Sequence, residues 1–379
     1  MRIQKNPFHL KGYHGAELFC NREKETSKLI ENAKNGVNTT LFSIRRMGKT
    51  GLIHHAFNTL GKEDKGGKWK CIYVDIYATQ SIAEFTNQLA SAIFKSFPPG
   101  NNIGEKFLNL IKGFSPIISY DSYTSVPEIS FSYKQPKQYI HSLTGLFKFL
   151  EQQKTQIIIA IDEFQQITNY PEKNTEAILR TIIQQLNNVV FIFSGSHKHL
   201  LLEIFNSAKR PFFSSTQALH LIEIDKEKYR EYIRRIFSER KRKIDKESTD
   251  FILEWTKIHT YYTQALCNKI FTQNISIIKI DHVYLACDSI LKEQETMFFQ
   301  YRNLLTSSQW NLLKAIAKEG KVYQPTGIEF VGKYNLGNPS SVRRSLAALE
   351  NKEMVFKETN KAAGYFQVYD CFLSRWLER

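Results

Sequence analysis

The sequence lacks a hydrophobic run long enough to cross a membrane. Among its 379 residues the longest unbroken aliphatic stretch is residues 157–161, Ile-Ile-Ile-Ala-Ile, whereas a transmembrane helix needs about 20 apolar residues. Residues 1–12 mix charged, polar and apolar side chains, so they lack the apolar core of a secretory signal. These two absences predict a cytoplasmic protein with no membrane contact.

Cysteine is also sparse: the chain has five copies, far apart, and none forms a Cys-x-x-Cys pair. This spacing suggests neither a disulfide framework nor a zinc site. We expect reduced and mostly buried thiols. They are Cys20, Cys71, Cys267, Cys287 and Cys371.

Acidic residues are outnumbered, with 37 Asp and Glu against 52 Lys and Arg and a net charge of +15. Such an excess favours an anionic partner, although lysine-rich surfaces also serve solubility. Hydrophobic residues make up 42% and aromatic residues 13% of the chain, which suffices for packed cores. At about 100–200 residues per domain, the length predicts two or three domains.

The first half of the chain alternates apolar, strand-like segments with amphipathic helical ones. This pattern is typical of a parallel sheet covered by helices on both faces. We therefore predict an α/β fold, with a β-hairpin insert near 116–133 that turns around 124–127. The expected strands are 37–44, 70–77, 156–161 and 189–193, and the expected helices are 17–34 (capped by Asn21), 50–60, 82–97, 137–153 and 176–186.

The pattern becomes helical after about residue 225 and changes again near residue 306. From there, three helices followed by two short strands are typical of a winged helix. The predicted domains are 1–225 for the α/β part, 226–300 for a helical domain and 301–379 for the winged helix. The expected helices of the last domain are 306–319, 327–334 and 340–352, and its strands are 354–358 and 365–369.

A loop between a predicted strand and a predicted helix reads Ser43-Ile-Arg-Arg-Met-Gly-Lys-Thr50. In such a loop Gly48 lets the backbone approach a phosphate, and the N–H groups at the helix start supply positive potential. Lys49 reaches the β- and γ-phosphates, and the Thr50 hydroxyl ligates Mg²⁺. The usual pattern begins with glycine, so this loop must accommodate the Cβ of Ser43. The predicted nucleotide-binding residues of the loop are Ser43, Arg45, Arg46, Met47, Gly48, Lys49, Thr50 and Gly51. Arg45 and Arg46 are also candidates to contact a neighbouring subunit or to pair with a nearby acid that fixes the loop.

Two acidic residues end an apolar strand, in the segment Gln156-Ile-Ile-Ile-Ala-Ile-Asp-Glu163. Such a strand places Asp162 beside the phosphate loop, where it holds magnesium through water. Glu163 is next along and polarises the attacking water as a general base. The following strand ends in Ser194-Gly-Ser196, where Ser194 is placed to contact the γ-phosphate or the water. The motifs predict a P-loop ATPase with ATP and Mg²⁺ as ligands, and with Thr50 and Asp162 at the metal.

Each motif taken alone has a plainer explanation. Asp162 and Glu163 are also a common charge pair at a helix start, and residues 194–196 are also an ordinary turn. Loops of this type also bind nucleotide without turnover, so a nucleotide-sensing DNA-binding regulator is the alternative to an ATPase. A kinase or GTPase is less favoured, because the guanine-reading pattern Asn/Thr-Lys-x-Asp is absent. Intact Lys49 and Thr50 argue against an inactive scaffold.

Taken together, the motifs resemble those of the prokaryotic AAA+-related ATPases of the STAND type, the archaeal-ATPase-like proteins. The similar segments are 19–25 (Phe-Cys-Asn-Arg-Glu-Lys-Glu), 45–50, 161–164 (Ile-Asp-Glu-Phe) and 259–264 (His-Thr-Tyr-Tyr-Thr-Gln). The resemblance implies an ATP-hydrolysing switch with a helical domain and a winged helix. Bound nucleotide then sets the domain arrangement for a protein partner that the sequence does not name.

The resemblance also implies roles for single residues. Arg22 is expected on the base side of the nucleotide. His259 and Tyr262 belong to a segment that normally reads Gly-His-Pro-Tyr-x-x-Gln, with Gly and Pro replaced here. Arg210 is the candidate to reach the γ-phosphate, in cis or from a neighbouring protomer, which leaves a homo-oligomer open; an ordinary salt bridge is the alternative. Asp75 ends its strand and either supports the metal site or caps the next helix.

The winged helix makes DNA a candidate partner. Arg343 and Arg344 lie near the start of helix 340–352, where a recognition helix places base or phosphate contacts. Winged helices also serve as protein-interaction modules, so the residues leave both partners open. Between 226 and 246, ten basic residues alternate with apolar ones at helical spacing, which predicts a solvated helix face.

Overall fold

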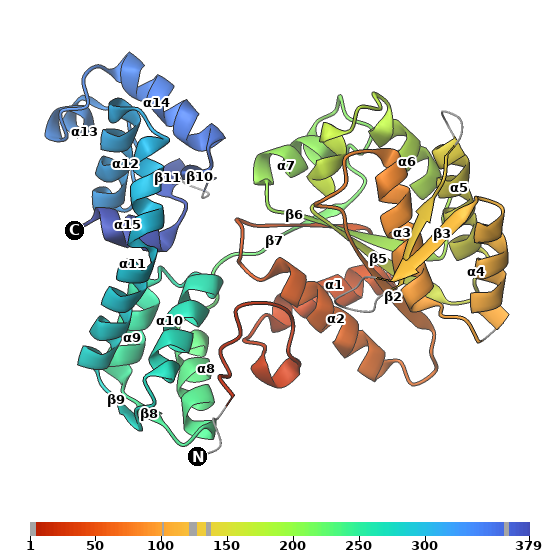
Figure 1. Cartoon of the computed structure of the whole chain (residues 1–379), viewed down its shortest axis with the longest axis horizontal. Helices are drawn as coiled ribbons and strands as arrows, with labels where there is room; N and C mark the ends of the chain where they lie inside the picture. The colour runs from red at the N-terminus through yellow and green to blue at the C-terminus, as the bar shows by residue number, and fades with distance from the viewer. Residues whose placement is uncertain (1–4, 101, 121–126, 134–137, 360–363) are drawn as a thin grey trace. The chain divides into compact units, whose positions relative to one another are not determined.

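The computed structural model describes residues 5–100, 102–120, 127–133, 138–359 and 364–379 (Figure 1). The chain divides into two compact units: Gly12–Ile222, and Glu223–Arg379 together with the N-terminal segment up to Lys11. The predicted division into three domains is finer than these two units and stays a prediction. No helix within the described ranges is long and apolar enough to span a bilayer.

Five strands form the sheet of the first unit: β1 (Thr39–Phe42), β2 (Trp69–Asp75), β5 (Gln156–Asp162), β6 (Val189–Gly195) and β7 (Gln217–His220). Their spatial order is β2-β5-β6-β1-β7, and every neighbouring pair is parallel. Parallel neighbours need crossover connections, which helices supply (Figure 1). The predicted α/β class with a parallel sheet is confirmed.

Helices cover both faces of this sheet: α1 (Glu23–Lys34) and α2 (Lys49–Glu63) on one face, and α3 (Ile82–Ser96) and α5 (Gln138–Glu151) on the other (Figure 1). Successive side chains of a strand point in opposite directions. A strand with an unbroken apolar run therefore presents apolar side chains to both faces of the sheet.

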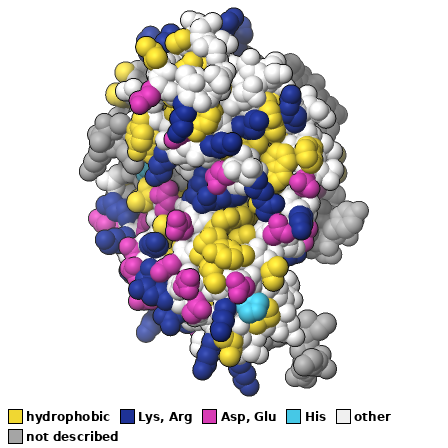
Figure 2. All heavy atoms as spheres, turned by 90° about the vertical axis from the view of Figure 1, so that its left-hand side faces the viewer, with side chains coloured by type: hydrophobic (Ala, Val, Ile, Leu, Met, Phe, Trp, Pro, Cys, Tyr) yellow, Lys and Arg dark blue, Asp and Glu magenta, His cyan; other side chains and the backbone are white. Residues whose placement is uncertain are grey.

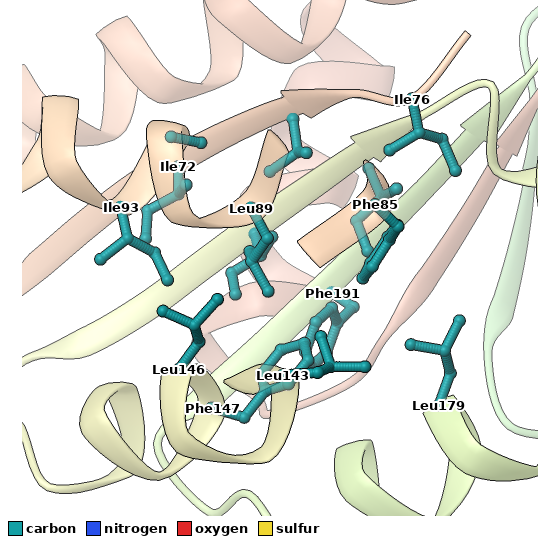
Figure 3. Close-up of a cluster of buried hydrophobic side chains, with 14 of the residues drawn as sticks. Ile72, Ile76, Phe85, Leu89, Ile93, Leu143, Leu146, Phe147, Leu179 and Phe191 are labelled. Atoms are coloured by element: carbon teal, nitrogen blue, oxygen red, sulfur yellow. The ribbon is translucent and has the colours of Figure 1, made fainter. Parts of the chain in front are cut away.

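The strand β5 illustrates this division. Its residues Ile157, Ile159 and Ile161 join the core beneath α3 and α5, part of which is drawn in Figure 3. Its residues Ile158 and Ala160 join the core beneath α1 and α2. The strand is therefore held from both sides, which fixes the position of the acidic pair at its carboxyl end.

A hairpin and shorter helices complete the first unit. β3 (Pro116–Tyr120) and β4 (Pro127–Phe131) pair antiparallel where the hairpin insert is predicted. Residues 124–126 of its predicted turn lie outside the described residues. The other elements are η1 (Ala16–Leu18), α4 (Asn102–Lys112), η2 (Phe164–Asn169), α6 (Thr175–Ile183) and α7 (Lys198–Asn206).

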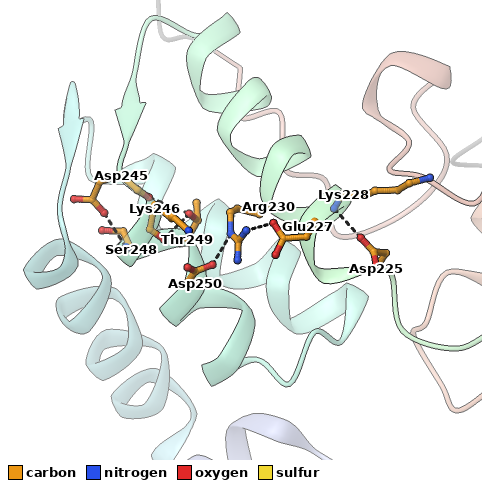
Figure 4. A network of polar contacts seen from close by, with 9 residues as sticks. All are labelled: Asp225, Glu227, Lys228, Arg230, Asp245, Lys246, Ser248, Thr249 and Asp250. Carbon is orange, nitrogen blue, oxygen red and sulfur yellow. Dashed lines mark hydrogen bonds and ion pairs between the residues drawn. The ribbon is translucent and has the colours of Figure 1, made fainter.

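The second unit begins with helices: α8 (Lys226–Glu239), α9 (Lys246–Trp255), α10 (Thr260–Thr272) and α11 (Ile280–Asn303), with a short parallel pair of β8 (Lys243–Ile244) and β9 (Ile277–Ile278). The charged run of α8 lies on the surface, as predicted. In Figure 4 the Nε of Arg230 donates to Asp250 at 2.5 Å, and the same guanidinium pairs with Glu227. The buried stripe of α8 is Tyr229, Tyr232, Ile233, Ile236 and Phe237.

The C-terminal part has the element order of a winged helix: α12 (Ser307–Glu319), α13 (Ile328–Lys333), α14 (Pro339–Asn351), β10 (Val355–Thr359), β11 (Gly364–Val368) and α15 (Cys371–Leu377). The strands β10 and β11 pair antiparallel. Helix α14 begins at a capping asparagine, because Asn338 Oδ1 accepts from Ser341 N at 2.8 Å. It buries Val342, Leu346 and Leu349, so its opposite face stays exposed.

The structure corrects the start of the first predicted helix. Helix α1 begins at Glu23, and its N-cap is Arg22 rather than Asn21. Asn21 and Arg22 have φ values of 55° and 79°, and this left-handed region interrupts a right-handed helix. The cap assigned to Asn21 and the helical start at residue 17 are therefore wrong. Sequence periodicity also gave no prediction for α4, α7, β7 and α15, which are short or border irregular segments.

We expect Phe212→Ala to destabilise the α/β unit. Phe212 is 1% exposed, and its ring lies 5.4 Å from that of Phe164 and 5.7 Å from that of Phe193. Truncating a buried phenylalanine costs about 3–5 kcal/mol. The neighbouring Phe213 is 47% exposed, so Phe213→Ala is the matched control. Urea unfolding followed by circular dichroism tests the pair, and equal midpoints for the two variants contradict this packing.

Candidate nucleotide site

The predicted phosphate loop connects β1 to α2. Gly48 is the N-cap of α2 with a φ of 96°, a conformation that glycine adopts without a Cβ clash. Arg46 is also left-handed, with a φ of 62°. Ser43 is fully buried, and its Oγ donates to the carbonyl oxygen of Ile44 at 2.8 Å. Ser43 is not one of the positive-φ residues, so the loop accepts a Cβ where glycine is usual.

The other loop residues have different surroundings. Met47 buries its side chain in the core beneath α1 and α2. A Cβ on Gly51 would lie 3.5 Å from the ring of Phe19, an ordinary contact distance. Arg45 Nε donates to the Oγ of Ser196 at 3.4 Å, which links the loop to the residue that follows β6.

Lys49 is the first residue of α2, and its side chain is buried against the phosphate loop. Its Nζ donates to the carbonyl oxygens of Ser43 and Ile44 at 3.4 and 3.3 Å and to Ser43 Oγ at 3.3 Å. Burial lowers the pKa of Lys49, while the charges of Glu163 and Asp162 act to raise it. The long bonds to neutral oxygens leave this ammonium group ready for a stronger anionic partner.

Asp162 gathers hydroxyl groups from three other elements. Thr50 Oγ1 of α2 and the Tyr73 hydroxyl of β2 both donate to Oδ2 at 2.7 Å, and Ser194 Oγ of β6 donates to Oδ1 at 2.7 Å. The backbone N–H of Glu163 also donates to Oδ1, at 3.1 Å. Asp162 is only 5% exposed, and these donors satisfy its buried charge. The structure thus brings Thr50, Asp162 and Ser194 together.

Glu163 lies beside Asp162 in a left-handed conformation, with a φ of 56°. Its Oε2 accepts from Ser196 Oγ at 2.9 Å, from Ser196 N at 3.2 Å and from Gln165 Nε2 at 2.5 Å. A non-glycine residue in this region is uncommon and marks a position that the surrounding structure determines. The carboxylate is therefore held next to the phosphate loop by a defined set of donors.

The sequence reasoning missed Tyr73 and Gln165 as site residues, and it included Ser196 only as part of the hydroxyl-bearing turn 194–196. Tyr73 lies on β2 opposite Ala160 of β5, and only the sheet register shows that its hydroxyl reaches Asp162. Asp75 pairs in register with Asp162. It does not cap the next helix, because Ser81 caps α3. Burial raises the pKa of Asp75. The hydrogen bond that Asp75 accepts from the backbone N–H of Tyr77 acts in the opposite direction and lowers the pKa.

Two predicted arginines have contrasting surroundings. Arg22 is 4% exposed, and its Nη1 pairs with Glu25 at 2.9 Å. Its Nη2 is buried and has no hydrogen-bond partner in the part of the chain that the structure describes. Arg210 instead forms ion pairs at 2.7 Å with both Glu176 and Glu203. In this structure Arg210 is therefore engaged in the salt bridges that were the alternative interpretation.

His259 and Tyr262 belong to the second unit. His259 is the N-cap of α10, and the two rings lie 4.6 Å apart. Tyr262 also contacts Phe372, with 4.7 Å between ring centroids. Both side chains are buried within this unit, and their role towards a nucleotide stays a prediction.

Comparison with protein families identifies the chain. The model described as "ATPase domain predominantly from Archaea" matches residues 19–259. The chain belongs to this family of ATPase domains. A second model, described as "Probable winged helix domain", matches residues 296–379. No curated protein matches the chain.

Solved structures share the fold of this ATPase-domain protein. The Walker-type ATPase of Pyrococcus abyssi is 18% identical, with a TM-score of 0.66 and coverage of 98% of this chain and 100% of that one. The ORC2 protein of Aeropyrum pernix, with ADPNP and ADP, is 14% identical, with a TM-score of 0.62 and coverage of 99% and 96%. The ORC1 protein of the same organism, in complex with DNA, is 14% identical, with a TM-score of 0.51 and coverage of 95% and 92%.

The hydroxyl cluster at Asp162 predicts a stability effect for Tyr73→Phe. This variant removes one donor to a buried carboxylate, which costs about 1–3 kcal/mol. Tyr77, four residues along the same segment, is 64% exposed, so Tyr77→Phe is the control. Thermal unfolding of both variants measures the difference. An unfolding midpoint for Tyr73→Phe that equals that of the control contradicts the contact with Asp162.

Proposed function

We propose that this protein binds ATP with Mg²⁺ and hydrolyses it. The observation that carries the proposal is the convergence of Thr50, Ser194 and Asp162 at 2.7 Å contacts, beside Lys49 and Glu163. These side chains come from α2, β5 and β6, and Glu163 follows directly after β5. They supply a phosphate ligand, a metal site and a base at the carboxyl ends of the strands.

The phosphate loop fits the anionic part of the nucleotide. The N-terminus of α2 presents backbone N–H groups after Gly48, and such helix starts bind phosphate. Lys49 exchanges its long bonds to carbonyl oxygens for charge-assisted bonds to the β- and γ-phosphates. Arg45 and Arg46 flank the same loop and add positive charge.

The hydroxyl and carboxylate pair fits a magnesium ion. Thr50 and Asp162 would hold Mg²⁺, which neutralises charge on the phosphates when it is bound. Both oxygens of Asp162 already accept hydroxyl hydrogens, so Asp162 would hold the ion through a water molecule rather than by direct ligation. Ser194 keeps the carboxylate oriented and lies close enough to the end of β6 to contact the γ-phosphate or the water.

Glu163 is placed to activate water. Its carboxylate accepts a proton as the water oxygen attacks the γ-phosphorus, the bond to the β–γ bridging oxygen breaks, and ADP and phosphate leave. Arg22 lies on the base side of the nucleotide, where its buried Nη2, which has no partner within the described ranges, offers a donor. For Arg210 to reach the γ-phosphate, in cis or from a second copy, it must first leave Glu176 and Glu203.

The nucleotide state would then act as a switch of the STAND type. ATP and ADP differ in charge and contacts at the phosphate loop, and His259 and Tyr262 would report that difference to the second unit. A protein partner reads the resulting arrangement. This part of the proposal rests on the family resemblance and on the presence of both units in one chain.

Two substitutions separate ATP binding from ATP hydrolysis. We expect Lys49→Ala to weaken ATP binding about tenfold or more, because it removes a charged hydrogen-bond donor. We expect Glu163→Gln to keep binding but to lower turnover by about a hundredfold or more, because the general base is lost. Isothermal titration with MgATP and single-turnover phosphate release measure the two effects.

The matched controls are Lys62→Ala and Glu151→Gln, which alter exposed residues of α2 and α5. Both are expected to behave as the wild type. A wild-type protein that does not bind MgATP overturns the proposal. Normal turnover in Glu163→Gln removes Glu163 as the base.

A second candidate function is DNA binding by a nucleotide-sensing regulator. Arg343 and Arg344 are exposed near the start of α14, where recognition helices contact DNA. The structurally similar Aeropyrum pernix ORC1 was solved in complex with DNA. On the face shown in Figure 2, Lys and Arg side chains are interspersed with Asp and Glu. On this face the mixed charges form no broad basic surface, so the proposed DNA contact is centred on α14.

DNA binding predicts a defined effect of the double variant Arg343→Ala, Arg344→Ala. Fluorescence anisotropy with a labelled duplex should show weaker binding and a salt dependence shallower by about one to two units of log–log slope. The control is Lys314→Ala, Lys318→Ala, which removes exposed charges from α12. Equal affinities for both double variants remove α14 as the DNA contact.

A further inference from the structure

Among the described residues, Gln165 forms the shortest hydrogen bond to the Glu163 side chain. It lies in η2, is 5% exposed, and its Nε2 donates to Glu163 Oε2 at 2.5 Å. An ionised carboxylate only accepts hydrogen bonds, so the amide nitrogen must face Glu163 and the amide oxygen must point elsewhere. The same Nε2 also lies 3.4 Å from His197 Nδ1.

The amide oxygen of Gln165 lies against Gly195, the last residue of β6. A Cβ built on Gly195 would lie 2.0 Å from Gln165 Oε1, so any side chain there displaces the amide. This oxygen is buried and has no hydrogen-bond partner among the described residues, a condition that costs about 1–3 kcal/mol. The protein thus keeps an unsatisfied oxygen in place in order to present the amide nitrogen to Glu163.

We infer that Gln165, seated against Gly195, is a positioning residue for the general base Glu163. The inference rests on the proposed function of Glu163. Gln165 and Ser196 donate to the same carboxylate oxygen, Oε2, which leaves Oε1 to take the proton from water. Together they fix the carboxylate of a residue whose backbone is left-handed.

Ser196 also connects Glu163 to the phosphate loop. Ser196 Oγ donates to Glu163 and accepts from Arg45 Nε at 3.4 Å. Positioning matters because a misplacement of about 1 Å in a reacting group lowers a rate by about a hundredfold. Loss of Gln165 should therefore act on the chemical step and leave the phosphate contacts of Lys49 intact.

The test uses single-turnover ATP hydrolysis and MgATP titration with the full-length protein. Gln165→Ala should lower the hydrolysis rate about ten- to a hundredfold, with the dissociation constant changed by no more than about twofold. Gly195→Ala leaves Gln165 in the chain but displaces its amide, so it should give the same split between rate and affinity. The control is Gln185→Ala, which alters an exposed glutamine after α6.

Double variants show whether Gln165 acts through Glu163. In the Glu163→Gln background, Gln165→Ala should lower the residual rate by no more than about twofold, because the effects of two residues acting as a unit do not add. For the same reason, Gln165→Ala with Gly195→Ala should be no slower than the slower single variant. Far-ultraviolet circular dichroism shows that each variant is folded, and Gly195→Ala supplies the test if Gln165→Ala does not fold.

The outcomes separate this inference from the proposed function. A wild-type protein without turnover, or a Glu163→Gln variant as fast as the wild type, overturns both. A slow Glu163→Gln variant beside a Gln165→Ala variant within about twofold of the wild type overturns only the positioning role. Equal fold losses from Gln165→Ala in both backgrounds also overturn it, because Gln165 then acts independently of Glu163.

Discussion

The carboxylate of Asp162 is the group on which the site depends. It is buried at the carboxyl end of β5 and accepts hydroxyl hydrogens from α2, β2 and β6. A buried charge is tolerated only when hydrogen bonds replace the water that it has lost. The same bonds therefore hold three elements of the sheet unit together and orient the residue that would hold magnesium. The hydrogen bonds to Asp162 therefore serve both the stability of the sheet unit and its proposed chemistry.

Three residues of the site have a left-handed backbone conformation. Arg46, Gly48 and Glu163 all have positive φ values, and two of them are not glycine. Such conformations persist only where the surrounding packing determines them. The packing comes from β5, whose alternate residues are buried in two separate cores. The sheet thus fixes the acidic pair at the end of β5, and a fixed polar arrangement is the condition for electrostatic catalysis.

Local sequence patterns were sufficient for the sheet, the loop and the acidic pair, because strand periodicity and the Gly-Lys-Thr motif are encoded by neighbouring residues. They were insufficient for Tyr73 and Gln165. These residues reach the site through strand register and a tight turn, which depend on pairing between distant segments. The predicted cap at Asn21 was wrong for a related reason. The left-handed backbone of Asn21 and Arg22 cannot be read from the amino-acid composition. Arg210 was ambiguous in sequence, and only the structure shows its pairs with Glu176 and Glu203.

The most direct test of the central claim is a crystal structure with a non-hydrolysable ATP analogue and Mn²⁺ in place of Mg²⁺. The account predicts that the β- and γ-phosphates lie over the N-terminus of α2, in contact with Lys49. It also predicts an anomalous manganese peak bonded to Thr50 Oγ1 and separated from Asp162 by one water molecule. A nucleotide bound elsewhere would contradict the account. So would a manganese ion that contacts Thr50 and Asp162 neither directly nor through a water molecule.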